Sequence, residues 1–152
     1  MNKRILSIVC AVFAASVALQ AQQAVHWKSL KDVTWSRKYV AKMSGYYQMP
    51  SFGKNIERMD NKEITIEGFY MPIDVDGSIF ALSETPSNAC FFCGVGGVES
   101  VMEIMVKKGH KKLTRVRTDR YIQLKGIFKI NRDDPFHLMY LLTDAELIKV
   151  IE

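Results

Sequence analysis

The chain has 152 residues, of which 48% are hydrophobic and 24% charged, with a formal net charge of +5. This length fits one domain, and the apolar content is high enough for a packed core. Its sequence has no low-complexity segment and no internal repeat, which excludes fibrous and solenoid architectures.

The first 21 residues are typical of a secretory signal peptide. Residues 2–4 form a short positive segment, and residues 5–19 are an unbroken run of 15 apolar or small residues. This run is shorter than the roughly 20 residues of a membrane-spanning helix. We expect cleavage after Ala21, no stable membrane anchor afterwards, and a periplasmic or secreted location. Cys10 lies inside the run, so a lipoprotein anchor is not expected.

Removal of residues 1–21 would leave 131 residues and, without Lys3 and Arg4, lower the formal charge from +5 to +3. It would also remove Cys10 and leave Cys90 and Cys93. An even pair of cysteines in an oxidising compartment forms a disulfide by default.

Residues 22–60 mix helical and turn-rich patterns and predict an irregular or partly helical N-terminal arm. A turn signal at residues 60–62 then precedes a β-rich domain over 61–152. We expect five strands there, at residues 62–72, 78–83, 100–107, 120–131 and 137–146.

Five strands with a longer link before the fourth predict a mainly β fold, a small OB-like Greek-key barrel. Gly68 and Gly126 lie within expected strands, where tight bends in a small barrel use glycine. The Asp-Gly pair in residues 74–77 indicates a hairpin turn rather than a calcium loop, because the ligand series does not continue. Residues 98–107 fit a helical stripe as well as a strand, and periodicity does not decide between them.

The segment "NACFFCGVGG", residues 88–97, is the expected functional loop. In one interpretation, Cys90 and Cys93 form a structural disulfide that fixes the glycine-rich loop, although closing so small a ring contributes only about 2 kcal/mol. In a second, the loop is a thiol–disulfide centre, although the strand-to-helix context of such redox sites is missing. We also expect the neighbouring Phe91, Phe92 and Gly94 to contribute to binding.

In a third interpretation the two cysteines bind a soft metal, copper or zinc. The loop offers two ligands, so further ligands are needed for zinc. His137 and Glu99 are the leading candidates, and the others are His110, Met102 and Met105.

The ordered set Trp27-x-x-Leu30, Gly68-Phe69-x-x-Pro72, the cysteine loop and "GIFKI…LLTDAE" resembles an exported bacterial family, domain-of-unknown-function 3299 (DUF3299). The resemblance covers residues 27–146, implies an extracytoplasmic location and a strand at 100–107, and supplies no established activity. Many relatives carry Cys-x-His in the loop. Phe92 stands where that histidine would be, so only a role for Cys90 carries over.

Residues 107–120 hold seven Lys or Arg and one acid, Asp119. Expected export and the small net charge argue against nucleic acid, so we expect a solvated loop, with contact to anionic lipid as an alternative. No nucleophile–base motif is present. The leading hypothesis is therefore an exported non-enzymatic accessory protein that binds a soft metal or a partner, another extracytoplasmic or membrane protein. The alternatives are a thiol–disulfide factor or an interaction module with a structural disulfide.

Overall fold

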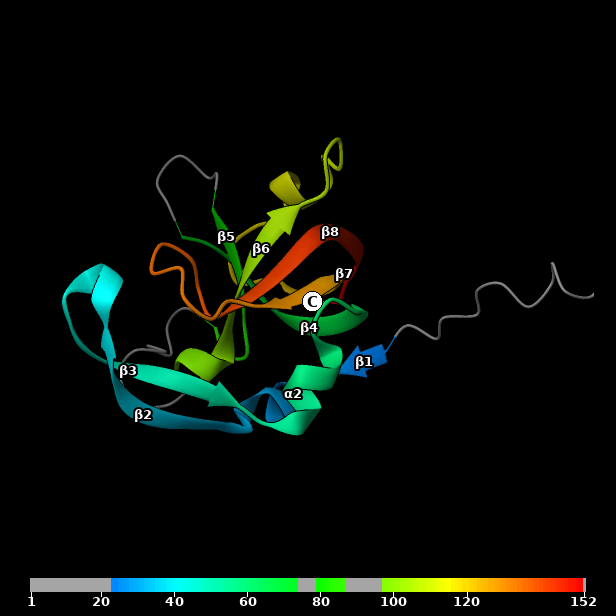
Figure 1. Cartoon of the computed structure of the whole chain (residues 1–152). Helices are drawn as coiled ribbons and strands as arrows, with labels where there is room; N and C mark the ends of the chain where they lie inside the picture. Colours follow the sequence, from blue (N-terminus) through cyan, green and yellow to red (C-terminus); the bar gives the residue numbers. More distant parts are fainter. Residues whose placement is uncertain (1–22, 74–78, 87–96, 152) are drawn as a thin grey trace, which may run out of the picture.

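The computed structural model describes residues 23–73, 79–86 and 97–151 (Figure 1). The predicted signal peptide, the Asp-Gly turn at 74–77 and the loop with Cys90, Phe91, Phe92, Cys93 and Gly94 lie outside the described residues. Within the described part, no helix is both long and apolar enough to cross a membrane.

Five strands form a closed barrel, which confirms the predicted fold class. They are β4 (Glu63–Pro72), β5 (Phe80–Ser83), β6 (Val101–Val106), β7 (Tyr121–Ile130) and β8 (Tyr140–Val150). Around the barrel the order is β4, β5, β6, β8 and β7, and β7 then pairs with β4. All pairs are antiparallel except β6 with β8, the crossover that a five-stranded Greek-key barrel needs. The short β1 (Gln23–Val25) adds to β4 in parallel.

The ambiguous segment before residue 107 is a strand, β6, preceded by one turn of 3-10 helix, η3 (Val98–Ser100). The last strand begins later than predicted, at Tyr140 rather than 137. Asn131 explains the delay, because its side-chain amide donates to the carbonyl oxygens of Asp134, His137 and Leu138. These bonds hold the chain in a turn until the strand begins. His137 therefore lies in this turn and not at a strand start.

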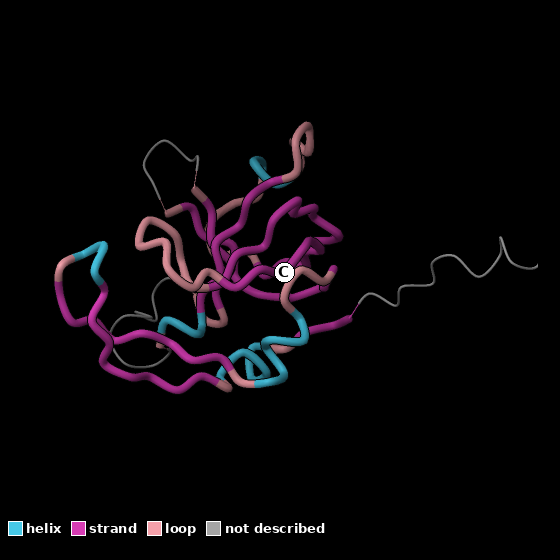
Figure 2. Tube along the Cα trace, in the orientation of Figure 1, coloured by secondary structure: helices cyan, strands magenta, loops and turns pink. Residues whose placement is uncertain are grey.

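The N-terminal arm contains the expected helical turns, η1 (Trp27–Lys31), η2 (Ala41–Met43) and α2 (Lys54–Met59). It also contains an antiparallel hairpin of β2 (Val33–Val40) and β3 (Gly45–Phe52), which the sequence reading did not predict. The hairpin projects from one side of the barrel (Figures 1 and 2). Most of its residues are exposed, so buried and exposed positions do not alternate along it.

Buried side chains attach the arm to the barrel. Leu30 is fully buried in the barrel core, and its carbonyl oxygen accepts a 2.6 Å hydrogen bond from the buried Tyr140 hydroxyl. The Trp27 Nε1 donates to the carbonyl oxygen of Glu67 on β4 at 2.7 Å. The arm and the barrel therefore share one hydrophobic core.

Gly68 and Gly126 lie where neighbouring strands come close. A Cβ at Gly68 would lie 2.6 Å from the Ser83 carbonyl oxygen, and one at Gly126 would lie 2.7 Å from that of Thr143. Both positions therefore require glycine for close backbone approach.

Candidate functional site

A cleft of about 300 Å³ lies between the β2–β3 hairpin and the turn over residues 131–139. We call it the hairpin cleft. In an OB-type barrel, the loop between the fourth and fifth strands is a common binding element, and the turn occupies that position here. The lining is mostly apolar, and consists of Trp35, Val40, Met43, Gln48, Met49, Pro50, Val98, Asn131, Arg132, Asp133, Asp134, Pro135, His137, Leu138 and Met139.

Three of the eight methionines in the chain line this cleft. Met43 ends η2, Met49 lies in β3, and Met139 precedes β8, so they come from both walls. His137 joins them in the lining. Thioether sulfur is a soft ligand that suits copper(I), and imidazole also binds copper. Methionine is also flexible and fills apolar surfaces, so the same residues suit an apolar ligand.

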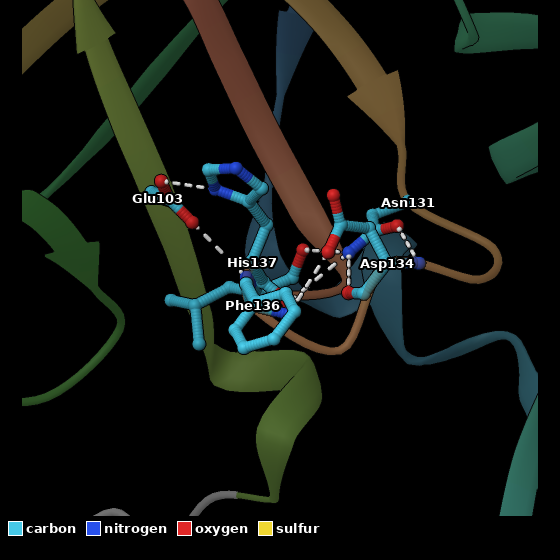
Figure 3. Close-up of polar contacts among 6 residues, drawn as sticks. Glu103, Asn131, Asp134, Phe136 and His137 are labelled. Atoms are coloured by element: carbon cyan, nitrogen blue, oxygen red, sulfur yellow. Dashed lines mark hydrogen bonds and ion pairs between the residues drawn. The ribbon is translucent and has the colours of Figure 1, made fainter. Parts of the chain in front are cut away.

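His137 has a fixed orientation because Glu103 on β6 binds it (Figure 3). The His137 Nδ1 lies 2.8 Å from one Glu103 carboxylate oxygen, and the Leu138 backbone amide donates to the other at 3.0 Å. The hydrogen bond to Glu103 raises the pKa of the His137 imidazole, and the negative charges of Glu103 and Asp134 act in the same direction. A carboxylate that accepts from one ring nitrogen leaves the other nitrogen as the available metal ligand.

The turn that carries His137 is also held from its other end. Both guanidinium nitrogens of Arg132 bind the two carboxylate oxygens of Glu57 on α2, at 3.0 and 2.6 Å. Arg132 further lies over the Phe52 ring, 5.6 Å from its centroid. This wall of the cleft is therefore tied to the arm as well as to the barrel.

Glu99, a predicted metal ligand, is not among the residues that line the cleft, but it binds one that is. Its carboxylate accepts a 2.8 Å hydrogen bond from the Trp35 Nε1, which joins η3 to the hairpin. The neighbouring Val98 lines the hairpin cleft and follows Cys93 by five residues in the sequence. Glu99 thus orients a cleft residue, while His137 lines the cleft itself.

The remaining predicted ligands are dispersed. His110 Nε2 accepts a 3.0 Å hydrogen bond from the Leu147 amide, Met102 is fully buried in the core, and Met105 is half-buried on β6. Within the described ranges, no group of three or more His, Cys, Asp or Glu residues is placed to hold a metal ion. The sequence alone did not indicate Met43, Met49 and Met139 as site residues, because their proximity depends on the unpredicted hairpin.

We expect the His137–Glu103 pair to make stability depend on pH. A raised folded-state pKa gives stability that is fully present below the unfolded value, about 6.5, and is lost as pH rises through the folded value. The effect should be less than about 1 kcal/mol, because His137 is more than a third exposed. Urea unfolding between pH 5.5 and 8.5 should show this loss in the wild type and not in Glu103→Gln. Equal pH profiles for both proteins would contradict it.

No family model matches the chain, and no curated protein matches it. Among solved structures, the chain is similar to a DUF3299 family protein from Pseudomonas aeruginosa PAO1, known from a crystal structure. The two share 11% sequence identity, the match covers 87% of this chain and 99% of the other, and the TM-score is 0.44. DUF3299 is also the family whose ordered motifs this sequence resembles.

Proposed function

We propose that the protein is an extracytoplasmic, non-enzymatic binding protein that holds a soft monovalent metal ion, copper(I), in the hairpin cleft. The observation that carries the proposal is the presence of three methionines and His137 in the lining of one cleft. Thioether and imidazole groups together favour copper(I) over hard cations such as magnesium or calcium. Cys90 and Cys93 are a second source of soft ligands in this proposal. Cys93 precedes Val98, which lines the cleft, by five residues in the sequence.

Copper(I) fits the described residues better than zinc. A structural zinc site needs four ligands from cysteine, histidine or carboxylate side chains. Among the described lining residues, His137 is the one histidine, and Asp133 and Asp134, the carboxylates, are exposed in the turn. Methionine is not a usual zinc ligand.

The first test is a calorimetric titration with silver(I), a soft ion that does not change its oxidation state, in chloride-free buffer. The triple variant Met43→Leu/Met49→Leu/Met139→Leu removes the thioethers and conserves volume, so the fold should tolerate it. We expect its affinity to fall at least about tenfold, which corresponds to about 1.4 kcal/mol. A control triple outside the cleft, Met59→Leu/Met71→Leu/Met105→Leu, should bind like the wild type.

The same titration on Cys90→Ser/Cys93→Ser separates the two sources of soft ligands. If the ion lies in the hairpin cleft, this variant keeps a silver(I) site that depends on the three cleft methionines. Loss of binding on changing the cysteines, together with no effect of the leucines, would assign the ion to the cysteine loop. Absence of binding in every form would overturn metal binding altogether.

A second candidate is an apolar segment of another extracytoplasmic or membrane protein in the same cleft. It is favoured by the apolar lining and by the exposed aromatic residues of the hairpin, Trp35, Tyr39, Tyr46 and Tyr47. Large exposed apolar surfaces often mark interaction sites. The leucine triple distinguishes the candidates, because leucine keeps the apolar surface and removes the sulfur. An apolar fluorescent probe that binds the wild type and this variant equally, while silver(I) binds neither, would favour the partner.

A further inference from the structure

A second hollow, of about 380 Å³, is lined by the basic segment that follows β6 and by the end of β8. The segment between β6 and β7, residues 107–120, lies well away from the β2–β3 hairpin in Figure 1. The two sites share no lining residue. We call it the basic hollow, and it is lined by Lys112, Arg115, Val116, Arg117, Arg120, Leu147 and Val150.

The basic segment is tied to the barrel and is not a free loop. Leu113, at the start of η4 (Leu113–Arg115), is fully buried in the core, and Val116 packs against the same core. Next to them, Tyr70 on β4 donates its backbone amide to the Arg120 carbonyl oxygen at 3.0 Å. The Tyr70 carbonyl oxygen accepts from the Asp119 amide at 2.8 Å. The backbone that carries the cations is therefore held in place.

Within the described part of the chain, the four cations of the basic hollow have no carboxylate partner. None of the described residues that line the hollow is acidic, and none of the four cations forms a salt bridge within 4.0 Å to a described residue. Nearby cations behave differently, since both Lys107 and Lys125 bind Glu146. Concentrating unpaired like charges costs stability through repulsion, unless an anion neutralises them. The hollow is therefore suited to an anionic ligand.

Apolar side chains accompany the cations. Val116, Leu147 and Val150 line the hollow, and Val150 is 45% exposed. Ile148 and Ile151, on either side of Val150 in the sequence, are also exposed. Exposed apolar side chains do not strengthen the binding of free phosphate. They do strengthen binding to a membrane, because they enter the headgroup region while the cations meet the anionic lipids.

We propose that the basic hollow binds the phosphate-bearing headgroups of an anionic phospholipid membrane. The hollow would bring the protein to the membrane surface through a site separate from the hairpin cleft. This inference does not depend on metal binding. Each cation near an anionic surface should raise the membrane partition coefficient by about fivefold.

The test is co-sedimentation of the protein, as the cell processes it, with vesicles. Vesicles of phosphatidylcholine with 30% phosphatidylglycerol are compared with vesicles of phosphatidylcholine alone. Arg115→Gln/Arg117→Gln should lower the partition coefficient about 30-fold, because the roughly fivefold effects of the two lost cations multiply. The matched control, Lys38→Gln/Lys42→Gln on the hairpin, makes the same change in net charge and should bind like the wild type. Binding should weaken strongly at 0.5 M salt.

The alternatives give other results. Equal losses for both double variants would show a general charge effect and overturn a local site. Competition by millimolar inorganic phosphate at constant ionic strength would assign the hollow to free phosphate instead. Stronger binding of an oligo-dT strand than of the anionic vesicles, lost in Arg115→Gln/Arg117→Gln, would overturn the lipid proposal in favour of nucleic acid. Circular dichroism of each variant checks that it is folded.

Discussion

Replacing Leu30 with alanine is expected to lower the free energy of unfolding by about 2–5 kcal/mol. Leu30 lies in η1, outside the barrel strands, yet its side chain is fully buried in the barrel core. The substitution removes buried apolar atoms and leaves a cavity, since Tyr140 still ties the backbone in place through the Leu30 carbonyl oxygen. Urea unfolding of the two proteins at one pH measures the difference.

Lys28→Ala is the matched control for this change. Lys28 belongs to the same 3-10 helix and is exposed, so its loss should change stability by no more than about 0.5 kcal/mol. A small effect of Leu30→Ala, equal to that of the control, would show that the arm does not share the barrel core. It would also remove the support for a hairpin cleft with a fixed shape.

Replacing Gly126 with alanine is expected to destabilise the protein by about 1–3 kcal/mol. The new Cβ would lie 2.7 Å from the Thr143 carbonyl oxygen, and real Cβ atoms do not come so close to backbone atoms. Either β7 or β8 must therefore shift, at a place where their pairing is already irregular between Lys125 and Ile127. The thermal midpoint and urea unfolding both measure the loss.

Gly45→Ala tests whether the loss comes from the close approach. A Cβ at Gly45 would meet the ring of Tyr47 at 3.1 Å. This ring is exposed on the hairpin, and its hydroxyl donates an exposed 3.3 Å hydrogen bond to the Met43 carbonyl oxygen, so a small shift of the side chain costs little. Alanine there should therefore be nearly neutral. If Gly126→Ala is as mild as Gly45→Ala, β7 and β8 are not packed as closely as the structure indicates.

The barrel was predictable mainly because β7 carries a clear period-2 pattern. Ile122, Leu124 and Phe128 are fully buried on one face of β7, and alternate with half-buried residues as the sequence indicated. The β2–β3 hairpin lacks this alternation of buried and exposed residues, because most residues on both of its faces are exposed. The start of the last strand was wrong by three residues, since the turn is set by Asn131 side-chain bonds that periodicity does not report.

The candidate site was predictable in part. His137 was singled out from the sequence and does line a cleft, but its partner is Glu103, 34 positions earlier. Such a pairing depends on β6 lying beside the last strand, which local spacing does not show. Met43 and Met49 come together with Met139 only through the hairpin. The cysteine loop was the strongest sequence signal, and its role stays a prediction.

The two proposals describe one molecule with separate surfaces. The basic hollow would hold the protein at an anionic membrane, while the hairpin cleft would stay available for an ion or a partner. This arrangement suits an exported accessory protein that works beside membrane components, as the leading hypothesis from the sequence expects.

Copper K-edge X-ray absorption of the protein loaded anaerobically with copper(I) is the most direct test of the proposed metal site. Copper(I) binding in the hairpin cleft predicts a coordination shell of sulfur and imidazole nitrogen around the copper, which persists in Cys90→Ser/Cys93→Ser. That shell should be lost in Met43→Leu/Met49→Leu/Met139→Leu. A sulfur shell that instead persists in the leucine variant and disappears with the cysteines would contradict copper(I) binding in the hairpin cleft.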